Sequence, residues 1–187
     1  MHEEVVFAGF GGQGVLFAGQ LLAYAAMAEQ KHVTWIPSYG PEMRGGTANC
    51  TVVVSDDMIG SPLVSRPSIA VVFNNPSLLK YQERVKPGGL LVVNRSIVES
   101  VSERSDILCL EIPATDVANE LGEVRLTNMV LCGAMLACRP VVALATWRET
   151  LTAELPARKK HLLEVNLTAI ERGVTLAQAQ IAAQTIV

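Results

Sequence analysis

A glycine-rich hexapeptide near the N-terminus is the part of this sequence whose residue types and spacing best suit a chemical task. Gly9, Gly11 and Gly14 follow the spacing G-x-G-x-x-G, with Gly12 and Gln13 inside it. An apolar run precedes the hexapeptide, and a segment rich in helix-forming residues follows it. A turn between a strand and a helix directs backbone N–H groups and the positive end of the helix dipole toward an anion. The hexapeptide therefore predicts a cradle for a phosphate or diphosphate group.

The same glycines have a second interpretation, which the sequence leaves open. They could simply allow the first helix to pack closely against the sheet, because glycine places no side chain at the contact. A nicotinamide dinucleotide site would also need an acidic residue about 20 positions further on, at the end of the second strand. That strand is predicted at 32–36, and no carboxylate stands at its end: Glu29 precedes it and Glu42 lies beyond the next turn. The sequence therefore disfavours an ordinary NAD(P) dehydrogenase.

The loop between the second and third predicted strands is a second candidate site. Prolines and glycines stiffen it, and it presents Tyr39, Glu42 and Arg44 next to Gly45 and Gly46. If the first two strands are parallel, this loop lies at the same sheet edge as the glycine turn. Arg44 is suited to bind a phosphate or carboxylate with two hydrogen bonds, and Glu42 could hold it in position. Alternatively, Glu42 and Arg44 form a surface ion pair, which contributes little to stability.

The two motifs together resemble the gamma subunit of 2-oxoacid:ferredoxin oxidoreductases. The residues that carry the likeness are GFGGQG at 9–14 and SYGPEMRGG at 38–46, and the 2-oxoglutarate branch is the most similar, followed by the branched-chain 2-oxoacid enzymes. Less specific likeness continues through 57–62, 120–122, 127–130 and 164–166, so it spans nearly the whole chain.

The resemblance implies a part in a complex that oxidatively decarboxylates a 2-oxoacid, transfers the acyl group to coenzyme A and reduces ferredoxin. In that family, thiamine diphosphate with its Mg²⁺ and the iron–sulfur clusters belong to the partner subunits, which are alpha, beta and often delta. This chain would then bind no cofactor alone and supply no catalytic residue. It would line the active-site cleft and contact coenzyme A through residues of the two glycine-containing motifs.

Apolar runs bounded by turn residues predict an α/β protein. Continuous runs such as 69–73 and 90–93 suit strands that are covered on both faces, so we expect a three-layer α/β/α sandwich with a mostly parallel, mixed, Rossmann-like sheet. Strands are predicted at 4–8, 33–36, 48–55, 69–73, 90–94 and 107–111, the third perhaps antiparallel to the others; helices are predicted at 12–30, 76–85, 114–121, 126–137, 141–155 and 156–172. We expect Gly173 to end the last helix and residues 177–187 to be ordered only by a partner.

Composition favours one domain over residues 1–187 that works with other subunits. The net charge of −3 gives no electrostatic reason to expect nucleic acid as a partner. Half of the residues are hydrophobic, yet no apolar run approaches the roughly 18 residues that span a bilayer. An apolar surplus without a membrane segment indicates buried subunit interfaces, and the isolated chain could pair with a second copy. The N-terminus carries no secretory signal pattern, which predicts a cytoplasmic protein.

The cysteines and histidines do not predict a metal or cluster site. The four cysteines show no C-x-x-C pair, and the three histidines lie far apart in sequence. Cys109 and Cys132 are expected to be buried as small hydrophobic residues, whereas Cys50 and Cys138 have no role that the sequence reveals. A free-standing nucleotide-binding or regulatory module remains an alternative function, because the glycine turn alone would suffice for it.

The loop motif makes a testable prediction about Arg44. A charge-assisted bidentate contact corresponds to roughly a tenfold to hundredfold change in affinity. Lysine keeps the positive charge but loses the planar fork, so Arg44→Lys in the assembled complex should raise the Michaelis constant for coenzyme A or for the 2-oxoacid. The melting temperature should change little. If Arg44→Ala leaves both Michaelis constants and the maximal rate unchanged, Arg44 does not belong to the site.

Overall fold

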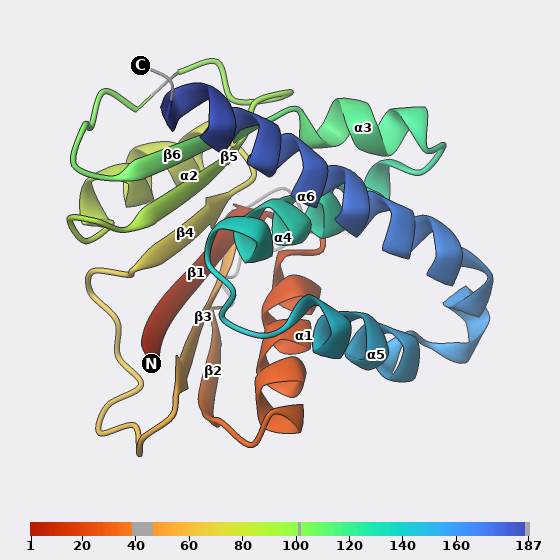
Figure 1. Ribbon diagram of the computed structural model, residues 1–187, viewed down its shortest axis with the longest axis horizontal. Helices are drawn as coiled ribbons and strands as arrows, with labels where there is room; N and C mark the ends of the chain where they lie inside the picture. Colours follow the sequence, from red (N-terminus) through yellow and green to blue (C-terminus); the bar gives the residue numbers. More distant parts are fainter. Residues whose placement is uncertain (39–46, 101, 186–187) are drawn as a thin grey trace.

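The protein is built around one six-stranded sheet with the strand order β2-β3-β1-β4-β5-β6 (Figure 1). The computed structural model describes residues 1–38, 47–100 and 102–185. Its strands are β1 (His2–Phe10), β2 (His32–Ser38), β3 (Thr47–Ser55), β4 (Ile69–Val72), β5 (Leu90–Asn94) and β6 (Leu108–Ile112). Each strand lies where the apolar runs predict one, with its ends shifted by at most two residues.

Strand directions place the two predicted loops at one edge of the sheet. β1, β4, β5 and β6 are parallel neighbours, and β3 is antiparallel to both β1 and β2. β2 therefore runs in the same direction as β1 although β3 separates them. Phe10 is paired with Thr47 and Ser38 with Asn49, so the glycine turn begins at the same edge at which the chain leaves β2 and enters β3. The mixed, mostly parallel sheet is confirmed.

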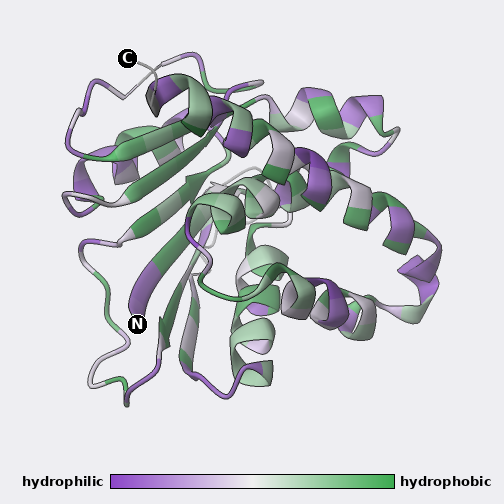
Figure 2. Cartoon of the chain, viewed as in Figure 1, coloured by the Kyte–Doolittle hydropathy of each residue, from purple (hydrophilic) through white to green (hydrophobic). Residues whose placement is uncertain are grey.

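Helices cover both faces of the sheet, but unequally. α1 (Val15–Ala28), α4 (Thr127–Cys138), α5 (Leu144–Glu154) and α6 (Leu163–Thr185) form the large core on one face, with α3 (Ala114–Glu120) at its margin. On the other face, a smaller core lies beneath α2 (Asn75–Tyr81) and the 3-10 turn η1 (Gln82–Arg84). Alternate residues of β1 point into the two cores. Val5 and Phe7 belong to the large core, and Val6 and Ala8 belong to the small one. Figure 2 shows the central strands as mainly hydrophobic and α3 as a mixture of hydrophobic and hydrophilic segments.

The last helix differs from its prediction. Residues 157–162 form a 3-10 turn, η3 (Ala157–Leu162), before α6 starts at Leu163, and α6 continues through Gly173 to Thr185. The expected stop at Gly173 is wrong because glycine ends a helix when it takes a left-handed conformation, and at Gly173 the chain stays helical. The helices of the described residues lack the combination of length and hydrophobicity that crossing a bilayer requires.

The end of α6 is ordered by this chain itself rather than by a partner. Ala177 is fully buried in the large core. One turn and two turns later, Gln180 accepts a hydrogen bond from the backbone N–H of Glu111, and Gln184 donates one to the carbonyl of Cys109. Both backbone groups belong to the edge strand β6, so the two glutamines occupy positions that a further strand would use. The prediction that residues 177–185 need another subunit is therefore wrong.

α4 and α6 cross closely because each has a glycine at the contact. A Cβ added at Gly133 would overlap the carbonyl oxygen of Ile170, and one added at Gly173 would overlap the carbonyl oxygen of Val130. Gly173 thus allows α6 to approach α4 closely, because it places no side chain at the contact. This crossing also fixes the position of the α4 N-terminus, which reaches the glycine turn.

The crossing generates a stability prediction. Gly173→Ala should lower the free energy of unfolding by about 1–3 kcal/mol, since backbone atoms on α4 cannot rotate away from the added methyl group. Gly60→Ala is the matched control, because nothing lies within 4 Å of a Cβ at that exposed position. Urea unfolding of both variants measures the difference. Equal stabilities would show that the two helices can separate at no cost.

Candidate anion-binding site

The turn after β1 is an open helix N-terminus. Gly12 and Gly14 have left-handed backbones with φ of 95° and 76°, which other residues adopt only at a cost. Gly14 is the N-cap of α1, and no side chain caps that end of the helix. The first N–H groups of a helix have no partner inside it, so they are available to an anion. Gly11 and Gly12 are exposed at this end.

Gln13 supports the turn from below. Its Oε1 accepts a hydrogen bond from the backbone N–H of Phe10 at 2.6 Å and a longer one of 3.5 Å from Asn74 Nδ2. The sequence predicts a ligand contact for Gln13, but its carboxamide oxygen is already used within the chain. Its observed role is to close the loop between β1 and α1.

Close packing accounts for two of the glycines. A Cβ at Gly9 would lie 2.6 Å from Gln13 Oε1, 2.8 Å from Phe73 Cβ and 2.9 Å from Val15 Cγ2. A Cβ at Gly14 would overlap the carboxamide of Asn128. Gly12, by contrast, has open space where a Cβ would stand. The two interpretations of the motif therefore apply to different glycines: Gly9 and Gly14 allow packing, while Gly12 leaves an accessible backbone.

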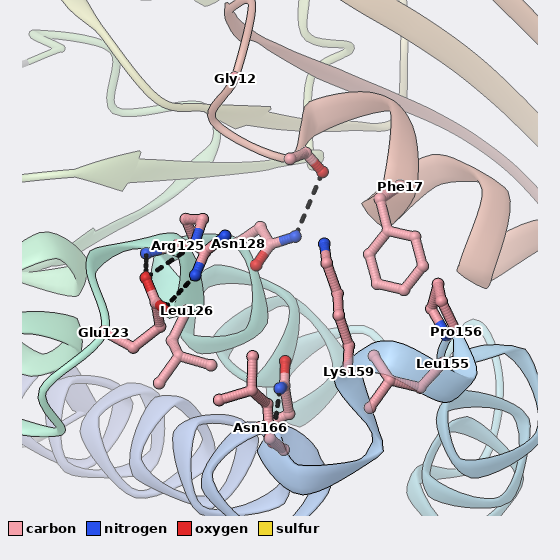
Figure 3. A pocket seen from close by; sticks show the side chains of 12 residues that line it. Gly12, Phe17, Glu123, Arg125, Leu126, Asn128, Leu155, Pro156, Lys159 and Asn166 are labelled. Atoms are coloured by element: carbon pink, nitrogen blue, oxygen red, sulfur yellow. Dashed lines mark hydrogen bonds and ion pairs between the residues drawn. The ribbon is translucent and has the colours of Figure 1, made fainter.

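A pocket of about 210 Å³ opens beside the turn, between α1, α4 and η3 (Figure 3). Gly12 and Gly14 form one side, and Asn128, Lys159 and Asn166 point into it from the other elements. Apolar side chains make up much of the remaining wall: Phe17, Leu126, Leu155, Pro156 and Leu162. Such a combination of an apolar wall with a few polar groups is typical of small-molecule sites.

A second hollow of about 300 Å³ lies on the other side of the same turn. Its lining includes Gly11, Gly12 and Phe17 together with Ser38 and Ala48. Ser38 and Ala48 lie close to the two ends of the predicted charged loop, so that loop leaves and rejoins the fold beside the glycine turn. The predicted site residues Tyr39, Glu42, Arg44, Gly45 and Gly46 lie outside the described residues.

Charge in the first pocket comes mainly from Lys159. Arg125 also lines the pocket, but Glu123 holds it with two hydrogen bonds, from Nε at 2.9 Å and from Nη2 at 2.5 Å. These bonds lower the pKa of Glu123 to about 2, so Glu123 and Arg125 both stay charged at ordinary pH and their opposite charges offset each other. Lys159 Nζ has no hydrogen-bond or ion-pair partner among the described residues. An anion in the pocket would therefore be attracted by Lys159.

Burial raises the pKa of all four cysteine thiols and so disfavours their thiolate forms. Burial raises the pKa of Cys50 to about 12 and that of Cys109 to about 11, and it raises the pKa of Cys132 further. Cys132 is fully buried and Cys109 partly so, in agreement with their predicted packing roles; Cys50 is also fully buried beside α1. Within the described residues, His, Cys, Asp and Glu form no group of three or more that could hold a metal ion.

Sequence reasoning missed Asn128, Lys159 and Asn166 as site residues. Asn128 and Asn166 do fall in segments 127–130 and 164–166, where the family resemblance continues, but nothing local distinguishes either asparagine from a surface residue. Lys159 belongs to the run RKKH, which reads as a solvated basic turn. The packing of α6 against α4, with η3 directly before α6, brings these side chains to the pocket beside the glycine turn.

The role of Gln13 yields a prediction. Gln13→Ala removes the acceptor for the Phe10 N–H, so we expect a loss of about 0.5–1.5 kcal/mol in stability and faster hydrogen exchange of that amide. Gln178→Ala, at an exposed position on α6, is the control. NMR-detected amide exchange measures the Phe10 N–H directly. If its exchange rate is the same in both variants, Gln13 does not support the turn.

The chain matches the family model described as pyruvate ferredoxin/flavodoxin oxidoreductase over residues 4–176. A ketoisovalerate oxidoreductase subunit VorA from Methanothermobacter marburgensis is 36% identical over 177 residues, which are 94% of this chain and 36% of that relative. The chain thus spans little more than a third of the length of the VorA relatives. A 2-oxoglutarate synthase subunit KorC from the same organism is 35% identical over 180 residues, which are 92% of this chain and 95% of that relative.

Solved structures share the fold. The gamma subunit of a keto/oxoacid ferredoxin oxidoreductase from Geobacter sulfurreducens superimposes with a TM-score of 0.81 at 27% identity, covering 95% of this chain and 99% of that one. A 2-oxoglutarate:ferredoxin oxidoreductase from Magnetococcus marinus gives a TM-score of 0.86 at 23% identity, covering 95% of this chain and 31% of that one, and shows likeness of fold alone. The chain therefore belongs to the pyruvate ferredoxin/flavodoxin oxidoreductase family and is of the gamma-subunit type.

Proposed function

We propose that this protein is the gamma subunit of a cytoplasmic 2-oxoacid:ferredoxin oxidoreductase that converts a 2-oxoacid and coenzyme A to an acyl-CoA. The observation that carries the proposal is the combination of family membership with two hollows that meet at one glycine turn. The turn has an accessible backbone, an uncapped helix N-terminus and a lysine without an ion-pair partner among the described residues. These groups suit the phosphates of coenzyme A.

Electron transfer and decarboxylation are assigned to partner subunits under this proposal. Thiamine diphosphate with Mg²⁺ and the iron–sulfur clusters would be bound there, and ferredoxin would be reduced through the complex. The cysteines of this chain agree with that division, since the sequence contains no C-x-x-C pair of the kind that ligates iron–sulfur clusters. The gamma subunit would then shape the cleft and hold the acyl acceptor.

Contact with the alpha and beta subunits, and with a delta subunit where one is present, is supported by exposed apolar side chains. Met58 and Leu63 lie in the connection between β3 and β4 and expose 87% and 81% of their surfaces. This connection contains segment 57–62, in which the family resemblance continues. Two large, exposed hydrophobic side chains in one connection favour burial by another protein.

The substrate that we favour is 2-oxoglutarate. The KorC relatives, which are 2-oxoglutarate synthase subunits, align with this chain over 92–95% of both sequences in three archaea. Ketoisovalerate is the second candidate, because the VorA relatives are 36–37% identical to this chain and the KorC relatives 33–35%, although this chain spans only 36–37% of the VorA sequences. Because partner subunits would complete the active site, the two candidates are to be separated by assay of the complex.

The proposal predicts that activity appears only in the complex. Co-expression with subunits encoded beside it should give a particle that reduces a viologen dye with 2-oxoglutarate and coenzyme A, at least tenfold faster than with ketoisovalerate. The purified chain alone should give no 2-oxoacid-dependent reduction. The measurement is the initial rate of dye reduction for both preparations and both substrates.

Three outcomes would revise this assignment. A faster rate with ketoisovalerate would move the substrate to the branched-chain class. Activity of the purified chain alone would contradict the division of labour. Failure of the chain to purify with any other subunit from its native host would favour a free-standing nucleotide-binding or regulatory module.

A further inference from the structure

We infer that the edge strand β2 binds a second copy of this chain, and that two copies join their sheets by antiparallel pairing of β2 with β2 across a twofold axis. The α1 helices of the two copies would then meet beside the strand pair. This contact is independent of the proposed function. In an assembled oxidoreductase it would join two gamma subunits.

The two edges of the sheet differ in how they are covered. At the β6 edge, the side chains of Gln180 and Gln184 hydrogen-bond to backbone groups of the strand, which blocks the addition of another strand. β2 forms the opposite edge, with β3 as its neighbour on the inner side. On its outer side, the backbone groups of β2 have no hydrogen-bond partner among the described residues, and every residue of the strand keeps part of its surface exposed. A strand of another chain can therefore pair there.

The elements along this edge contain no charged side chain. Neither β2, with the sequence HVTWIPS, nor α1, with the sequence VLFAGQLLAYAAMA, contains Lys, Arg, Asp or Glu, although these residues make up 18% of the chain. Edge strands that stay in water are commonly protected by charged side chains, above all lysine. The cores of protein interfaces, by contrast, are depleted of charge and enriched in aromatic residues and methionine. The composition of β2 and α1 therefore favours burial by another chain.

Exposed hydrophobic side chains lie on both sides of this edge. α1 packs directly on β2, since a Cβ at Gly19 would lie 3.2 Å from Trp35 Nε1, and Figure 1 shows the two elements side by side. The outer surface of α1 exposes 38% of Tyr24 and 60% of Met27. Trp35 packs against the large core, so its neighbour Ile36, which is 39% exposed, faces the other side of the sheet. Hydrophobic surface thus accompanies the open backbone on both faces.

A second copy fits this edge because the edge is complementary to itself. An antiparallel pair of identical strands related by a twofold axis offers donors to acceptors in both directions, and here it brings no like charges together. Pro37 has no N–H group to offer, so it belongs outside the new ladder. Residues 32–36 then form the ladder, with Thr34 on the twofold axis opposite its own counterpart.

Self-association is tested by sedimentation velocity of the full chain over a wide range of concentrations, where we expect a reversible dimer. Met27→Lys and Ile36→Lys should each raise the dissociation constant of the dimer roughly tenfold or more, because each places a charge in a contact that excludes water. Leu79→Lys is the matched control, since Leu79 is 65% exposed on α2, and it should leave the dissociation constant unchanged. Circular dichroism checks that all three variants are folded.

The register is tested by cysteine cross-linking. Thr34→Cys should form a disulfide between two copies under mild oxidation, because directly opposed Cα atoms of an antiparallel pair lie about 4.5–5.5 Å apart. His32→Cys is the control, since the two positions 32 would lie about 13 Å apart along the strands, too far for a disulfide. Non-reducing electrophoresis compares both variants with the parent chain, which carries four free cysteines of its own.

Several results would overturn the inference. They are a parent chain that stays monomeric at every concentration, a dimer that Met27→Lys and Ile36→Lys leave intact, an equal effect of Leu79→Lys, or cross-linking of His32→Cys as fast as that of Thr34→Cys. If the two lysine variants spare self-association but prevent co-purification with other subunits, a strand of a partner subunit covers β2 instead. None of these results bears on the proposed function, because a complex that oxidises a 2-oxoacid can contain one gamma subunit or two.

Discussion

The contact between Asn128 and Gly14 is the constraint on which the site depends. The first turn of α4 lies so close to the N-cap of α1 that any side chain at position 14 would overlap the Asn128 carboxamide. The same carboxamide donates a hydrogen bond to the Gly14 carbonyl, so the two helix ends are joined by a partly buried polar contact. The left-handed backbone of Gly14 turns the chain into α1 at this point. Loss of this contact would let the pocket wall move relative to the turn.

A series of buried polar residues extends this constraint along the carboxyl ends of the parallel strands. Asn74, directly after Phe73, reaches Gln13 and caps α2 by accepting from the Ser77 N–H. Asn94, at the end of β5, donates to the Phe73 carbonyl and to Thr115, and it accepts from the Thr115 N–H. Strand ends leave backbone groups without ladder partners, and these amides supply the missing hydrogen bonds. The edge that carries the glycine turn is therefore rigid before any ligand arrives.

Most of the fold follows from local patterns, whereas most of the candidate site does not. The runs at 69–72 and 90–93 are apolar throughout because both faces of those strands are covered, and this signal predicts buried parallel strands. The local sequence wrongly predicts a helix end at Gly173, because this glycine allows α6 to cross α4 closely, and α4 lies far from it in sequence. Lys159 carries no local signal, and Asn166 carries none beyond the resemblance at 164–166; both line the pocket because α6, with η3 directly before it, packs against α4. The glycine motif predicts where an anion could bind, but which glycines pack and which remain accessible depends on Phe73 and Asn128, which come from other elements.

The central claim is that a gamma-type subunit contributes the phosphate-binding part of a composite coenzyme A site, at its glycine turn. A cryo-electron microscopy structure of the assembled complex with coenzyme A tests this claim most directly. We expect density for the phosphates between Gly12 and Lys159, with the pantetheine arm directed toward the partner subunits. Coenzyme A bound with its phosphates on another subunit, or a partner side chain filling the pocket, would contradict the account.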